Sequence, residues 1–139
     1  MSKTAAEIEA DFYTLIKGSS LEEAVTGTVY YDEIRPRDSE KEDIVIMGSS
    51  GEDGQTQIGV VTIHIYVPDI MSNNDGLMYP NRGRIKKLER AAQDWFESIK
   101  GALLGYSFRL YHTIHITADE ENINQHYVVI QIKYKLYNY

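Results

Sequence analysis

Residues 43–68, DIVIMGSSGEDGQTQIGVVTIHIYVP, are the stretch that decides the fold. Two β-branched apolar runs flank a break rich in Gly, Ser and Asp, which predicts a long antiparallel hairpin with Gly48-Ser49-Ser50-Gly51 as its turn. From Gln57 the residues alternate between two faces, Gly59, Val61, Ile63, Ile65 and Val67 on one and Ile58, Val60, Thr62, His64 and Tyr66 on the other. Because both faces are largely apolar, we expect this strand in the middle of the sheet, with other elements covering both of its sides.

Helical periodicity flanks the hairpin on both sides. Thr4 with Glu7 forms a capping box, and an apolar stripe then runs until Gly18: Ile8, Phe12, Leu15 and Ile16. Ser20 with Glu23 predicts a short helical turn over residues 21–24, followed by a strand over 25–31 whose Gly27 indicates a bulge or close packing. The strongest helix begins at Arg84 and ends near Gly101 or Gly105, with apolar residues at helical spacing: Ile85, Leu88, Ala92, Trp95, Phe96 and Ile99.

The last third of the chain has the pattern of a second hairpin. In residues 106–117 the even positions are mostly apolar and the odd positions include Ser107, Arg109 and Thr113. In residues 126–139 the even positions from Val128 to Leu136 are again apolar, while Gln131, Lys133 and Lys135 face outward. The order of elements predicts a single α+β domain, residues 1–139, with a mainly antiparallel sheet of about five strands and two helices packed on it.

Two segments lack periodicity. Residues 32–42 are charged and interrupted by Pro36, which is typical of a surface loop. Residues 69–83 hold several helix and strand breakers, and loops of this length inside a compact domain are commonly functional arms. We therefore interpret 69–83 as a moving part. Its apolar residues Leu77, Met78 and Tyr79 are expected to dock, either on this subunit or on another.

Composition limits the class of protein. The 139 residues are 42% hydrophobic and 25% charged, values typical of globular domains rather than of disordered or membrane-spanning chains. There is no charged-then-apolar leader and no cysteine, so we expect a cytoplasmic protein without disulfides or thiolate metal sites. A formal net charge of −7 disfavours nonspecific binding to nucleic acid or to an anionic membrane.

Basic residues are nevertheless clustered. Arg82, Arg84, Lys86 and Lys87 fall within six residues at the predicted start of a helix, where the helix dipole favours acids instead. Such a cluster can face the acidic surface of a neighbouring copy, as in a head-to-tail ring. A solvated face or an internal salt bridge explains it equally well. The 11 tyrosines fit either a contact surface or simply a protein rich in strands.

No pattern in the sequence specifies catalysis. His112 and His115 lie three apart on a strand and therefore point to opposite faces, so they cannot share a metal ion. His115 and His126 flank the last hairpin loop and can face each other across it, but a metal site there would need a carboxylate as a further ligand: Asp119, Glu120 or Glu121. The chain has no P-loop, no G-x-S-x-G elbow and no dinucleotide-binding fingerprint. We expect no enzyme activity, no cofactor and no metal.

The layout resembles that of the tail-completion or tail-terminator proteins of long-tailed bacteriophages and prophages. The resemblance spans nearly the whole chain and rests on the order of its parts: an opening helix, Gly27-Thr28-Val29-Tyr30 with Arg35-Pro36 shortly after, the 42–46 strand, the 57–68 strand ending IYVPDI, a basic helix and a closing hairpin. These are features of layout rather than signature motifs. No position matches a family residue closely enough to assign it a contact.

What the resemblance implies is a structural protein that assembles as a ring, typically of six copies, caps the finished tail tube and joins it to the head connector. Its place would be the bacterial cytoplasm during assembly and then the neck of the virion. The contacts would come from the basic cluster and the tyrosine-rich strands. Two alternatives stay open. One is a small non-enzymatic α+β module of a bacterial accessory system that binds a protein on its sheet, and the other is an enzyme of unknown type.

Overall fold

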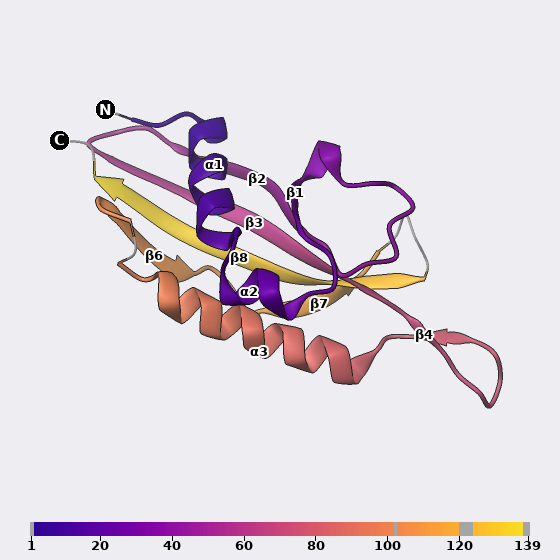
Figure 1. Ribbon diagram of the computed structural model, residues 1–139. Coiled ribbons are helices and arrows are strands. Elements are labelled where there is room, and N and C mark those ends of the chain that lie inside the picture. The colour runs from indigo at the N-terminus through magenta and orange to yellow at the C-terminus, as the bar shows by residue number, and fades with distance from the viewer. Residues whose placement is uncertain (1, 102, 120–123, 138–139) are drawn as a thin grey trace.

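The computed structural model describes residues 2–101, 103–119 and 124–137. Its helices are α1 (Ala5–Ile16), α2 (Ser20–Ala24) and α3 (Arg82–Ile99), with a 3-10 turn η1 (Asp32–Ile34). Its strands are β1 (Val29–Tyr31), β2 (Ile44–Glu52), β3 (Thr56–Pro68), β4 (Ile70–Met71), β5 (Met78–Tyr79), β6 (Tyr106–Leu110), β7 (His115–Ala118) and β8 (Gln125–Tyr137). Figure 1 shows them as one layer of helices on one twisted sheet, with a small hairpin projecting beyond it.

The main sheet has the strand order β1-β2-β3-β8-β6. Strand β3 is its central strand, as the alternating pattern predicts, and it pairs with β8 along its whole length. Strands β6 and β7 both pair with the other edge of β8. Every pairing is antiparallel except that of β1 with β2, which is parallel. The fold is therefore α+β with a mainly antiparallel sheet, which confirms the predicted class.

The expectation that both faces of the sheet are covered is wrong. All three helices place their buried residues in one core with the odd-numbered residues of β3 and the even-numbered residues of β8. On the opposite face no helix packs within the described ranges, and the even-numbered residues of β3 stay partly or largely exposed. Val45 and Val129 are buried on that face yet lie outside the core cluster. The apolar residues of the second face are covered by neighbouring side chains, not by another layer.

The predicted turn of the central hairpin is also wrong. Residues 48–51 belong to β2 and pair with residues 59–62 of β3, so the turn lies at 53–55. The glycines of this segment instead permit a β-bulge and close packing within the sheet. Gly48 has a φ of +151° beside a β-bulge. Gly51 lies opposite Gly59, and a Cβ on either residue would stand less than 3 Å from the Tyr134 hydroxyl.

Several boundaries differ from those predicted. The 106–117 strand is broken into β6 and β7 by residues 111–114, and the 25–31 strand is only β1 because residues 26–28 bend around Glu42 instead of pairing. Helix α2 takes Ser19 as its N-cap rather than Ser20, and α3 begins two residues earlier than expected, capped by Asn81. The predicted capping box of α1 is confirmed, with both reciprocal bonds present.

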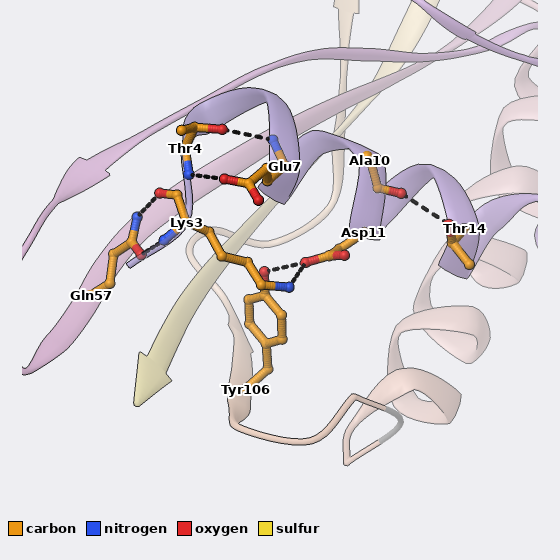
Figure 2. Close-up of polar contacts among 8 residues, drawn as sticks. All are labelled: Lys3, Thr4, Glu7, Ala10, Asp11, Thr14, Gln57 and Tyr106. Atoms are coloured by element: carbon orange, nitrogen blue, oxygen red, sulfur yellow. Dashed lines mark hydrogen bonds and ion pairs between the residues drawn. The ribbon is translucent and has the colours of Figure 1, made fainter. Parts of the chain in front are cut away.

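Polar contacts fasten α1 to the sheet (Figure 2). The Lys3 backbone exchanges two hydrogen bonds with the buried Gln57 side chain, at 3.0 and 2.9 Å. Asp11 accepts from the Lys3 ammonium at 2.6 Å and from the Tyr106 hydroxyl at 2.7 Å. Burial, and then the bond to Asp11, raise the pKa of Tyr106 above its usual range. Together with the indole of Trp95, which donates to the Leu15 carbonyl, these bonds fix the helical layer.

Candidate interaction surfaces

Residues 70–79 form a projecting arm rather than a structureless loop. Strands β4 and β5 pair as Ile70↔Tyr79 and Met71↔Met78, so one pair lies on each face of the arm. The tip is held by Asp75, which accepts from the Leu77 amide at 2.9 Å and from the Tyr79 hydroxyl at 2.6 Å. These bonds lower the pKa of Asp75, and the same contact raises the pKa of Tyr79. The arm therefore has a defined shape while extending away from the body, as Figure 1 shows.

The arm is apolar on both faces and exposed. The exposed fractions are 51% for Ile70, 65% for Met71, 59% for Leu77, 38% for Met78 and 43% for Tyr79. The three apolar residues predicted to dock therefore do not dock on their own subunit. A two-stranded hairpin is at best marginally stable alone in water, and one with apolar groups on both faces gains from being covered. These features make the arm a candidate contact surface.

The basic cluster divides into two parts. Arg82, Lys86 and Lys87 are exposed at the start of α3, next to the base of the arm. Arg84 is not available, because its guanidinium binds both carboxylate oxygens of Glu42, at 2.6 and 2.7 Å, and also donates to the Ala24 carbonyl. This bidentate pair raises the pKa of Arg84 further. The internal salt bridge left open by the sequence thus accounts for Arg84, and the other three cations remain candidates for contacts.

The helix-free face holds an aromatic cluster near the start of β8. His64 stacks on Tyr127 with ring centres 4.1 Å apart, and Arg35 lies over the Tyr66 ring at 3.8 Å. A shallow cavity of about 340 Å³ opens beside them, with Asp32 and Asp119 in its lining. Burial lowers the pKa of His64 to about 4, so its imidazole is neutral at physiological pH. The cavity thus brings a neutral imidazole, aromatic rings and two carboxylates together on the helix-free face.

Sequence reasoning missed a second group of cations on the same face. Arg109 of β6 lies directly opposite Lys133 of β8, and Ser107 lies opposite Lys135. The three cations and Tyr137 line a small hollow of about 120 Å³. Among the described residues none of the three makes an ion pair. The alternating pattern of the sequence already showed that these residues face outward. It did not show the strand register, which sets Arg109 opposite Lys133, 24 residues later.

The histidines do not form a metal site in the described part of the chain. His115 pairs with Val129 and so lies on the helix-free face, whereas His126 lies on the other face and binds Asp69 at 2.7 Å. The two rings therefore do not face each other. His112 is exposed in the break between β6 and β7. No three potential ligands converge among the residues described, and Glu120 and Glu121 lie outside them.

Two further findings bear on function. No helix in the described ranges is long and apolar enough to cross a membrane. The chain matches no protein-family model, and it matches no curated protein.

Proposed function

We propose that this chain is a structural protein of a phage or prophage tail, which forms a ring of about six copies that caps the tail tube and joins it to the head connector. The observation that carries the proposal is the β4–β5 arm. It has a fixed shape and presents five large apolar side chains to solvent. The layout of the chain, which is similar to that of tail-terminator proteins, supports the same function.

In such a ring the arm has a direct use. It lies against an adjacent copy and removes its apolar residues from water, while Arg82, Lys86 and Lys87 at its base meet acidic surface. A chain with a net charge of −7 has acidic surface to offer, and the three cations give the contact its orientation. Residues 69–83 thereby keep the role of a contact segment that the sequence suggests.

A second candidate function is favoured by the helix-free sheet face. Its aromatic cluster and cavity are what a small protein-binding module of a bacterial accessory system would offer to a peptide or protein. That function needs the sheet face and a monomer or dimer. The ring function needs the arm and a larger closed oligomer.

Particle mass separates the two functions. Light scattering over a concentration series, with negative-stain imaging of the most concentrated sample, is expected to show a closed ring of about six copies. The variant Leu77→Ser with Tyr79→Ser keeps the far-ultraviolet circular dichroism of the wild type but stays monomeric, because the arm no longer gains from burial. The control Leu77→Met with Tyr79→Phe loses the same hydrogen bond to Asp75 but keeps the arm apolar, and it is expected to assemble normally.

A wild type that is monomeric at every concentration, and also when mixed with tail tubes, would contradict the proposal. An arm variant that assembles as well as the control would leave the oligomer in place but would remove the arm from its contacts, and with it the observation that carries the proposal.

A further inference from the structure

We call Arg109, Lys133 and Lys135 the cationic patch. Their mutual repulsion lowers the stability of the sheet. Arg109 and Lys133 are cross-strand neighbours, and like charges in that position destabilise a sheet. Lys135 lies two residues along the same strand, on the same face. On that face Glu52 is two strands away from Lys135, since Ile58 of β3 lies between them. Repelling cations gathered on an open face of an acidic protein indicate that a partner supplies the negative charge.

The patch also has an apolar border. Ile58 pairs with Lys135 and Val60 pairs with Lys133, so both lie beside the cations on the same face. Ile58 is 39% exposed, and Tyr137 at the end of β8 is 41% exposed. The matching surface must therefore carry acids around an apolar side chain.

Such a surface exists on this chain, at the opposite edge of the sheet. The turn formed by η1 and the residues after it, 32–41, leaves four acids exposed: Asp32, Glu33, Asp38 and Glu40. Among them stands Ile34, which is 61% exposed. Arg35 binds Asp43 at 3.0 Å and does not neutralise these acids, whereas Arg37 and Lys41 of the same segment are exposed, so the segment presents four acids and two cations to solvent. We call residues 32–41 the acidic turn.

The acidic turn cannot reach the cationic patch of its own subunit. The turn follows β1, the edge strand on one side, while Arg109 lies on β6, the edge strand on the other. Asp32 lines the cavity beside Tyr127, and the patch begins six residues further along β8, roughly 20 Å away at about 3.4 Å per residue. That distance is longer than two facing side chains can bridge, so the contact does not form within one subunit. Two complementary surfaces at opposite edges make a head-to-tail contact between copies.

We propose that the cationic patch of one copy binds the acidic turn of the next copy, with Ile34 packed against Ile58 and Tyr137. This inference rests on the proposed ring, and it deepens it by naming a second pair of surfaces that meet between subunits, besides the arm. Each copy uses one patch and one turn, so the contact is heterologous and repeats around a closed ring. The occupant is a second copy of this chain.

Cysteine cross-linking tests the contact directly, because the full chain contains no cysteine of its own. Ile34→Cys and Ser107→Cys are both at exposed positions. Mixed and oxidised, the two variants are expected to give a 34–107 dimer in at least about fivefold higher yield than either variant alone, since a head-to-tail contact never brings two copies of one position together. The double variant is expected to give a ladder of cross-linked species.

Charge reversal checks that the cations carry the contact. Adding Lys133→Glu and Lys135→Glu to Ser107→Cys is expected to lower the 34–107 yield about tenfold, and adding Asp32→Lys and Glu33→Lys to Ile34→Cys is expected to restore it. The control Arg90→Glu with Lys100→Glu makes the same charge change on the outer side of α3 and leaves the yield unchanged. A reversal that lowers retention of duplex DNA but not the cross-link yield would assign the patch to nucleic acid and overturn the inference.

The same samples separate this inference from the ring itself. A closed oligomer in light scattering without any 34–107 product overturns the contact and leaves the ring in place. A 34–107 ladder that never closes supports the contact and overturns the ring. Homodimers cross-linked through 34 and 34, in place of 34 and 107, overturn the head-to-tail arrangement.

Discussion

At the scale of single residues, His64 shows how packing on the helix-free sheet face changes the pKa of a side chain. Its ring is stacked on Tyr127, and its Nδ1 atom is buried without a hydrogen-bond partner among the described residues. Burial lowers its pKa from 6.5 to about 4; the nearby Asp119 raises it slightly and His115 lowers it. Burial raises the pKa of Tyr66, so its hydroxyl stays neutral in this range, and Asp32 is the other acid in the lining. The imidazole therefore resists protonation in the folded state.

The consequence is a stability that depends on pH. Between pH 6.5 and about 4 the unfolded chain binds a proton at His64 and the folded chain does not, so this contribution is complete above pH 6.5 and is lost as the pH falls toward 4. Its slope cannot exceed about 1.4 kcal/mol per pH unit because the two states differ by at most one proton at His64. Urea unfolding at pH 7 and at pH 4.5 is expected to show a smaller loss of stability for His64→Phe than for the wild type. His112→Phe, at an exposed position, should keep the wild-type loss, and equal losses in all three proteins would contradict the assignment.

At the scale of elements, the pairing of β2 with β3 depends on two opposed glycines. Gly51 and Gly59 leave the space that the Tyr134 side chain of β8 fills. A Cβ at Gly59 would stand 2.2 Å from the Ser50 carbonyl oxygen and 2.5 Å from the Tyr134 hydroxyl. Because the first of these atoms is backbone, the strands themselves would have to separate. Gly51, which the sequence places in a turn, is thus a packing position within the sheet, opposite Gly59.

Gly59→Ala is therefore expected to destabilise the protein by about 3 kcal/mol, at the upper end of overpacking effects. The measurement is the free energy of unfolding in urea. Gly83→Ala is the matched control: Gly83 lies in the first turn of α3 with nothing nearer than 4.0 Å to the new Cβ, so the change should stabilise the helix by up to about 1 kcal/mol. Two variants of equal stability would show that the strands adjust without cost.

At the scale of the whole molecule, features set by residues close in the sequence were predictable, and features set by distant residues were not. Local patterns were sufficient for the α1 capping box, the central position of β3 and the class of the fold. They also singled out the arm residues Leu77, Met78 and Tyr79. Long-range contacts were not predictable: no local signal pairs Arg84 with Glu42, or sets Arg109 opposite Lys133. The sequence did not reveal that the second face is uncovered. Apolar residues on both faces of a strand are compatible with a second layer of helices and equally with cover by a few neighbouring aromatic side chains.

The two layers and the acidic turn are joined at consecutive acids, Glu42 and Asp43, just before β2. The Glu42 carboxylate binds Arg84 of α3, and the Asp43 carboxylate binds Arg35 at 3.0 Å and the Ser39 hydroxyl at 2.6 Å. Each acid is at most 5% exposed. Glu42 therefore holds α3, which carries the exposed cations, and Asp43 holds the acidic turn. Reversing the charge of Arg84 in an assembly experiment would therefore perturb the fold as well as the contact between copies.

Arg84→Met is accordingly expected to lower the free energy of unfolding by about 3 kcal/mol, because it strands the buried Glu42 carboxylate with only the Thr26 amide as a donor. Lys86→Met with Lys87→Met, at exposed positions two and three residues further along α3, should change it by less than about 0.5 kcal/mol. In the double variant Glu42→Gln with Arg84→Met the loss should be smaller than the sum of the single losses, since the stranded charge is gone. Urea unfolding of the four variants decides this: additive losses would mean that the pair does not hold α3 to the sheet, and Arg84 would return to the candidate contact residues.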